Sequence, residues 1–184
     1  NKVGPGHIHH LDYGRIKLGE HRADGSSAGV TDRMRAIAAD LEAAGIPHDL
    51  ADDLLLARWQ KLVWNIPYNG LSVVLDAMTD AIMADESARH LVEALMAEVV
   101  MGAGAFGRVI DENHVWKMLD DTSKMKPYRT SMKVDYDERR PLEIEAMYDA
   151  PLRAAADREV LMPRVAALRD HLRFLDTRNR QSPS

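Results

Sequence analysis

The feature that most constrains the fold is a helical repeat of apolar residues that continues almost without interruption from Thr31 to the C-terminal end. Apolar residues recur three or four positions apart, which is the spacing that places side chains on one face of an α-helix. Thr31 or Asp32 can cap the first helix, and Gly45 followed by Pro47 is typical of its end. The repeat therefore predicts a mainly α-helical protein.

The same repeat predicts further helices along the chain. They are expected near residues 49–66, 79–106, 113–121, 127–137, 141–158 and 163–175. Pro67 lacks the backbone N–H that a helix interior uses, so the helix around it should bend or break between Asn65 and Asn69. The polar residues 178–184 are expected to form a disordered tail.

The first 29 residues follow a different pattern. A Gly-Pro-Gly turn at residues 4–6 precedes two alternating segments, 7–11 and 15–18, which predict a β-hairpin or two edge strands. Two isolated strands are marginal in water, so we expect them to belong to a larger sheet or to pair with another chain. Residues 21–29 are polar and contain glycine and serine, as linkers do, and the helical domain is expected to cover residues 30–177.

Composition limits the possible function classes. Of 184 residues, 46% are hydrophobic and 29% charged, as in folded proteins rather than disordered ones. A net charge of −5 with interspersed signs argues against nucleic-acid binding, and the lack of cysteine excludes disulfides and thiolate metal ligands. No apolar run approaches the roughly 20 residues of a membrane span, and no signal peptide is recognisable. We therefore expect a cytoplasmic protein, and the absence of an initial Met suggests a fragment or a processed chain.

A possible polar stripe is formed by Lys61, Asn65 and Asn69, which lie four positions apart in an otherwise apolar segment. On a helix this spacing offsets successive side chains by about 40°, so an ammonium group and two amides would share one face. Such a stripe can hold a small polar ligand, or it can be the ordinary solvated face of an amphipathic helix. In carbonyl reduction a lysine can donate the proton and a carboxylate can orient the lysine, but the spacing does not select that carboxylate.

Other motifs favour structural interpretations. Residues 102–107 match the dinucleotide fingerprint Gly-x-Gly-x-x-Gly, but a helical repeat rather than a strand precedes them, which predicts close helix packing instead. His7, His9 and His10 are expected on a surface strand rather than at a metal site. Ser131 lacks the Gly-x-Ser-x-Gly frame of a hydrolase nucleophile.

Three segments in a fixed order resemble the C-terminal domain of the ketopantoate reductase (2-dehydropantoate 2-reductase) family. They are Lys-Leu-Val-Trp-Asn-Ile-Pro-Tyr-Asn at 61–69, Thr-Ser-Met at 130–132 and Arg-Pro-Leu-Glu-Ile-Glu at 140–145. The resemblance extends from about Gly14 to about Leu175. It implies a helical domain of the 6-phosphogluconate-dehydrogenase-like type, with residues 1–29 a two-stranded remnant of the nucleotide-binding domain and its linker.

The resemblance also implies roles for five residues. Lys61 matches the catalytic general acid, and Glu143 matches the acid that contacts the substrate hydroxyl near the lysine. Asn65 and Asn69 match residues that line the substrate pocket, and Ser131 matches a substrate-binding residue. The implied parent is an NADPH-dependent reductase of a small 2-oxo acid, which in this family is ketopantoate on the route to pantothenate and coenzyme A.

Further expectations follow from the same resemblance. A homodimer is expected, and the chain alone should be inactive because the NADPH-binding domain is absent from it. Tyr128 stands where the family pattern has Asn, and Asp149 stands where it has Gly, so the exact 2-oxo acid stays open. The alternative is a non-catalytic helical module for dimerisation or interaction.

Overall fold

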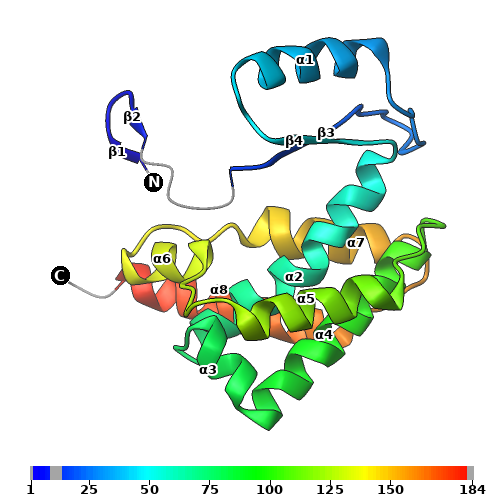
Figure 1. The fold of residues 1–184 in the computed structure, drawn as a ribbon. Helices are drawn as coiled ribbons and strands as arrows, with labels where there is room; N and C mark the ends of the chain where they lie inside the picture. Colours follow the sequence, from blue (N-terminus) through cyan, green and yellow to red (C-terminus); the bar gives the residue numbers. More distant parts are fainter. Residues whose placement is uncertain (1, 9–13, 182–184) are drawn as a thin grey trace. The chain divides into compact units, whose positions relative to one another are not determined.

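The computed structural model describes residues 2–8 and 14–181 of the chain. Its contacts divide the chain into two compact units, Asn1–Ala57 and Arg58–Ser184. Helices make up most of the described residues, which confirms the predicted mainly α-helical class (Figure 1). In the described residues, no helix is long and apolar enough to cross a membrane.

The first unit begins with a short antiparallel pair, β1 (Lys2–Gly4) and β2 (His7–Ile8). The predicted Gly-Pro-Gly turn joins these strands, and Gly6 has a φ of +69°, which a side chain would strain. Of the two predicted alternatives, the hairpin between residues 7–11 and 15–18 is wrong, because in the described residues β2 pairs with β1 and residues 16–19 pair with residues 48–51. Residues 9–13, including His9 and His10, lie outside the described residues.

A second strand pair in this unit is parallel. β3 (Ile16–Gly19) pairs with β4 (His48–Ala51), and the helix α1 (Asp32–Ala43) lies between them in the sequence. This strand–helix–strand order is how parallel neighbours are connected. The helix that was predicted to start between Asp49 and Asp53 begins at Leu54, because residues 48–51 form β4. The expected domain boundary near residue 30 stays a prediction, although β4 groups with β3 through the strand pairing.

The ends of α1 agree with the local signals. Thr31 is its N-cap and accepts a hydrogen bond from the backbone N–H of Met34 at 3.3 Å. Gly45 follows the helix with a φ of +68°, the left-handed conformation in which helices commonly end. Both predicted caps are confirmed.

The helix α2 (Leu54–Val74) runs for 21 residues with Pro67 inside it. The helix does not break between Asn65 and Asn69, and the predicted bend there stays a prediction. A proline in a helix costs about 3 kcal/mol, but every residue from Ile66 to Val73 is buried, and this packing outweighs the lost hydrogen bond.

The middle of the second unit contains four helices. These are α3 (Thr79–Ala84), α4 (Glu86–Gly104), α5 (Glu112–Lys124) and α6 (Ser131–Asp137). The single helix predicted for 79–106 is divided, because the Asp85 side chain accepts a hydrogen bond from the N–H of Ala88 at 2.8 Å and caps a new helix.

The last part of the chain contains a short π-helix η1 (Glu145–Asp149), then α7 (Ala150–Ala156) and α8 (Pro163–Gln181). The predicted start of the final helix at Pro163 is confirmed. The helix continues four residues into the expected tail, and residues 182–184 lie outside the described residues.

The α8 helix receives its N-terminal cap from another helix. Glu98 of α4 is only 1% exposed, and its two carboxylate oxygens accept the backbone N–H groups of Arg164 and Val165, each at 3.0 Å. The Arg164 guanidinium adds a contact at 3.2 Å. A buried charge is thus compensated by the first turn of α8.

Candidate functional site

The predicted polar stripe lies on the unbroken part of α2, within the second unit. Exposure falls along it: Lys61 is exposed, Asn65 is half-buried and Asn69 is 2% exposed. Because the helix does not break at Pro67, the three side chains keep the four-residue spacing of one face. The stripe therefore runs from the surface into the interior.

The buried end of the stripe is joined to α6. The Asn69 Nδ2 group donates to the carbonyl oxygen of Asn65 at 3.0 Å. Its Oδ1 accepts the backbone N–H of Met132 at 3.2 Å and the Ser131 hydroxyl at 3.4 Å. The structure thus brings together three of the five predicted residues, Asn65, Asn69 and Ser131. The Ser131 residue itself stays exposed.

Two buried hydroxyl groups beside this contact were missed as site residues. Ser72 Oγ and Thr130 Oγ1 lie 2.7 Å apart, and both residues are 0% exposed. Ser72 continues the stripe one step beyond Asn69, at a three-residue helical spacing, so the pattern could have found it. Thr130 is the N-cap of α6, and its Oγ1 accepts the N–H of Lys133 at 3.2 Å.

The same region of α6 holds a charged cluster around Lys133, which is 9% exposed. Its ammonium group contacts Asp76 at 2.7 Å and also pairs with Asp137. Burial lowers the pKa of Lys133, but the hydrogen bonds to the two carboxylates outweigh it and raise the pKa above its usual value. The lysine therefore stays charged and holds α6 to the residues that follow α2.

The other end of the stripe is open. Lys61 and Glu143 are both exposed, and the described residues show no ion pair between their side chains. The segment of Glu143 is nevertheless tied to α2, because the buried Tyr148 hydroxyl donates to the carbonyl oxygen of Ile66 at 2.8 Å. Ile66 lies five residues after Lys61, a rise of about 8 Å along the helix.

Tyr148 reaches α2 at a glycine. A Cβ on Gly70 would lie 2.7 Å from the Tyr148 hydroxyl and 2.5 Å from Cδ2 of Leu168, so only glycine allows this approach. Burial raises the pKa of Tyr148, and a backbone hydrogen bond from Gly70 offsets part of that rise. The hydroxyl therefore remains a neutral donor to α2.

The two departures from the family pattern have structural partners. Asp149 is 5% exposed and pairs with Arg173 at 2.8 Å and Arg169 at 3.4 Å, both on α8. The Tyr128 ring lies 6.1 Å from that of Trp64 on α2. Asp149 thus joins η1 to α8.

The glycine-rich match at 102–107 has the structural role that was predicted for it. It spans the C-terminal end of α4, and a Cβ on Gly102 would lie 2.9 Å from the Trp59 ring of α2. No strand leads into it, so this segment does not fit a dinucleotide pyrophosphate. Close helix packing is confirmed at Gly102.

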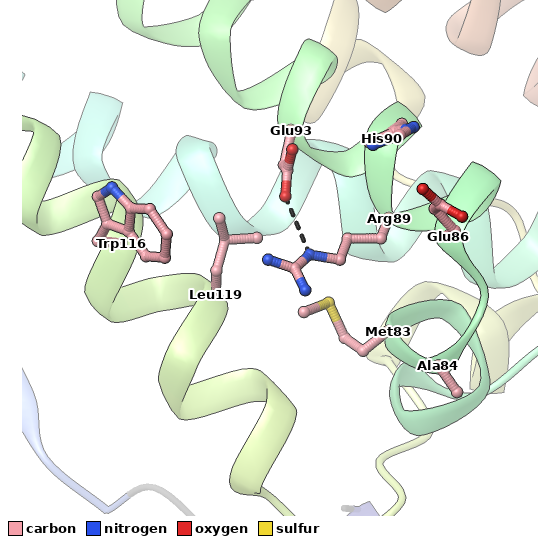
Figure 2. A pocket seen from close by; sticks show the side chains of 8 residues that line it. All are labelled: Met83, Ala84, Glu86, Arg89, His90, Glu93, Trp116 and Leu119. Carbon is pink, nitrogen blue, oxygen red and sulfur yellow. Dashed lines mark hydrogen bonds and ion pairs between the residues drawn. The ribbon is translucent and has the colours of Figure 1, made fainter.

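A groove of about 680 Å³ lies elsewhere in the second unit, between α3, α4 and α5 (Figure 2). Its lining residues are Met83, Ala84, Glu86, Arg89, His90, Glu93, Trp116 and Leu119. Figure 2 shows the Arg89 guanidinium paired with Glu93, at 3.0 Å, and the Trp116 ring at one end. None of the five predicted site residues lines this groove.

Comparison with known proteins shows the family of this chain. Residues 53–176 match the model of the ketopantoate reductase PanE/ApbA C-terminal domain. The chain belongs to this ketopantoate reductase family. It is 58% identical over 180 residues to a 2-dehydropantoate 2-reductase from Nostoc, and the match covers 98% of this chain and 56% of that protein. The chain spans about half the length of the relatives that it matches.

Solved ketopantoate reductases share the fold. A 2-dehydropantoate 2-reductase from Geobacter metallireducens superposes with a TM-score of 0.86 at 41% identity, over 95% of this chain and 57% of that one. A dimeric ketopantoate reductase from Staphylococcus aureus has a TM-score of 0.75 at 22% identity, over 82% of this chain and 53% of that one. The predicted family and helical fold are confirmed.

Proposed function

We propose that this chain is the substrate-binding and proton-donating part of an NADPH-dependent reductase of a small 2-oxo acid, ketopantoate or a close analogue, that works in the cytoplasm. The observation that carries the proposal is the contact between α2 and α6, which joins Asn65, Asn69 and Ser131 next to an exposed lysine on the same helical face. The resemblance to the ketopantoate reductase family implies that these positions contact the substrate.

Lys61 is the proposed proton donor. When hydride reaches a ketone carbon, negative charge develops on the oxygen, and an ammonium group stabilises that charge and transfers its proton to it. The hydride comes from NADPH, and the described residues contain no Gly-x-Gly-x-x-Gly turn between a strand and a helix. Because this chain spans about half the length of its relatives, the proposal assigns nucleotide binding to the remaining part of the full-length protein.

The remaining polar residues are proposed to hold the acid. Asn65, Asn69 and Ser131 build one side of the site, because amide and hydroxyl groups can donate to a carboxylate and accept from a hydroxyl. Glu143 is proposed to accept the substrate hydroxyl and to orient Lys61 when substrate is bound. Its exposure suits this role, because the carboxylate is open to a ligand.

The test is NADPH oxidation by the full-length protein that contains these 184 residues, monitored at 340 nm with ketopantoate and other 2-oxo acids. A chimera that adds the unmatched part of the Nostoc relative provides a second source of the nucleotide site. We expect oxidation that depends on a 2-oxo acid in both. If neither protein oxidises NADPH with any 2-oxo acid, the reductase assignment is wrong.

We also propose that the protein is a homodimer that uses the groove of Figure 2. Trp116 is 65% exposed there, and the groove presents Arg89 together with Glu86 and Glu93. A patch with both charge signs around an apolar centre can pair with itself across a two-fold axis. The Staphylococcus aureus relative is dimeric. Sedimentation should find a dimer that Trp116→Glu dissociates, and an unchanged dimer would exclude this surface.

The groove is also the observation that favours a non-catalytic interaction module. That alternative predicts the same dimer but no 2-oxo acid binding. Titration of the isotope-labelled chain with ketopantoate, followed by NMR, separates the two. Shifts at Asn65 and Ser131 favour the reductase, whereas an unchanged spectrum favours the module.

A further inference from the structure

A directed chain of hydrogen bonds links the start of α6 to α2. The Ser72 hydroxyl donates its only proton to the carbonyl oxygen of Asn69 at 3.0 Å. The 2.7 Å contact between Ser72 and Thr130 must therefore be donated by the Thr130 hydroxyl. Thr130 Oγ1 in turn accepts the N–H of Lys133. The order of donation is thus Lys133, Thr130, Ser72 and Asn69.

Water cannot replace one of the hydroxyl groups in this series of hydrogen bonds without a change in the structure. Ser72 and Thr130 are 0% exposed and Asn69 is 2% exposed. Removing one hydroxyl leaves one buried donor unpaired, namely the Thr130 O–H when Ser72 is truncated and the Lys133 N–H when Thr130 is truncated. This series of hydrogen bonds therefore fixes the distance between α2 and the first turn of α6.

The residues on both sides of Ser131 are held in place by hydrogen bonds. Thr130 before it is bonded to Ser72, and the backbone N–H of Met132 after it is bonded to Asn69 Oδ1. The Ser131 side chain remains exposed while its backbone is held on both sides. Asn69 is buried and its oxygen accepts two donors, so the orientation of its amide is fixed.

We propose that Ser72 and Thr130 are positioning residues for substrate binding, and that they act through Asn69 and Ser131, whose orientation they fix. This inference rests on the proposed reductase function. Ser72 and Thr130 set the backbone of α6, and Asn69 sets the direction of the Ser131 hydroxyl. The substrate then meets a hydroxyl that is already oriented, which lowers the entropic cost of binding.

The first experiment compares Ser72→Ala with Ser123→Ala in the full-length protein. Both serines donate to the carbonyl oxygen three residues earlier, at 3.0 Å in Ser72 and 2.7 Å in Ser123, but Ser123 is exposed on α5. We expect Ser72→Ala to raise KM for the 2-oxo acid about tenfold with little change in kcat. Ser123→Ala should change neither. A loss of kcat at constant KM would mean that Ser72 only supports folding.

The second experiment asks whether the hydroxyl of Thr130 is the working group. Thr130→Ser keeps the hydroxyl, and Thr130→Val keeps the shape without it. We expect normal KM in Thr130→Ser and an increase of about tenfold in Thr130→Val. The ion pair between Lys133 and Asp76, at 2.7 Å, should keep α6 attached in both variants. Equal KM values would overturn the proposal.

The third experiment is a double-mutant cycle. If Ser72 acts through Ser131, then Ser72→Ala should raise KM in the wild-type protein but not in a Ser131→Ala background. Equal increases in both backgrounds would show that Ser72 acts independently of Ser131, contrary to the proposal.

Amide hydrogen exchange tests the hydrogen-bond chain without enzymatic activity. In the 184-residue chain, Thr130→Val should speed exchange of the Lys133 and Met132 amides about tenfold or more relative to Thr130→Ser. Unchanged exchange would contradict the positioning role even in an active reductase. A wild-type protein without NADPH oxidation would instead contradict the proposed function, so the two failures are distinguishable.

Discussion

The two ends of the polar stripe on α2 are built in opposite ways. At the inner end, Asn69 is buried, and its side-chain amide group forms hydrogen bonds with Asn65, Ser131 and Met132. At the outer end, Lys61 is exposed, and in the described part of the chain its ammonium group has no hydrogen bond or ion pair. One end has a fixed geometry, and the other keeps its conformational freedom.

This difference separates two tasks that a reductase site must perform. Recognition of an acid requires donors and acceptors at set positions, which buried hydrogen bonds provide. Proton donation requires a charged group that can approach the substrate oxygen, which an unpaired surface lysine can do. Changes at the outer end should therefore alter rate without stability, and changes at the inner end should alter stability.

The largest effect is expected for Lys61→Ala. Loss of a general acid lowers kcat by about 100- to 10,000-fold, whereas removal of an exposed side chain leaves the free energy of unfolding within about 0.5 kcal/mol. NADPH oxidation and urea unfolding measure the two quantities. Lys124→Ala is the control, because Lys124 is an exposed lysine paired with Asp120 on α5. Wild-type kcat in Lys61→Ala would refute the proton-donor role.

The next largest effect is expected for Gly70→Ala, which should lower stability rather than activity. The new Cβ would overlap Leu168 and the Tyr148 hydroxyl, which should lower the free energy of unfolding by about 1–3 kcal/mol. Gly104→Ala is the matched control, since nothing lies within 4 Å of a Cβ at that helical glycine. The control should be neutral or slightly stabilising. Equal urea midpoints for the two variants would refute the close contact at α2.

Glu143→Gln should lower kcat/KM for the 2-oxo acid about tenfold, because an amide loses the charge that accepts the substrate hydroxyl. Stability should not change, because Glu143 is exposed. Glu145→Gln is the control, since Glu145 is also exposed but pairs with Arg153 at 2.6 Å. Similar kcat/KM values for the two variants would remove Glu143 from the site.

The smallest effect concerns the alkaline stability that α2 owes to Tyr68, whose side chain is 0% exposed and whose hydroxyl contacts Met83. Burial raises the pKa of Tyr68 to about 12 from its usual value of 10.0, so the unfolded chain loses this proton at lower pH than the folded one. The contribution of Tyr68 is complete below pH 10 and declines as pH rises toward 12. Tyr68→Phe should make the alkaline decline in the free energy of unfolding shallower. An unchanged slope would contradict the shift.

Elements with local signals could be predicted from the sequence. Thr31, Gly45 and Pro163 mark helix ends through their own backbone and side-chain chemistry, and each was assigned correctly. The strand β4 could not be predicted, because its four residues become a strand by pairing with β3 some thirty positions away. Pro67 misled for the same reason, since its local cost is outweighed by packing that the sequence does not display.

The same difference between local signals and distant contacts applies to the site residues. Helical spacing placed Lys61, Asn65 and Asn69 on one face, and the resemblance added Ser131 and Glu143. Spacing could not reveal that Asn69 is buried, because its burial depends on α6, which begins more than sixty residues later. Helical spacing could have added Ser72, three residues after Asn69, but its partner Thr130 follows only from the contact between α2 and α6.

The cap that Glu98 provides for α8 has a consequence for the order of folding. The first turn of α8 receives two hydrogen bonds from a carboxylate 66 and 67 residues earlier in the chain. Helix nucleation is the costly step, so α8 should acquire stable structure only after α4 has formed and docked. A synthetic peptide of residues 163–181 should therefore be largely unfolded in water, and its helicity should depend on a partner from the middle of the chain.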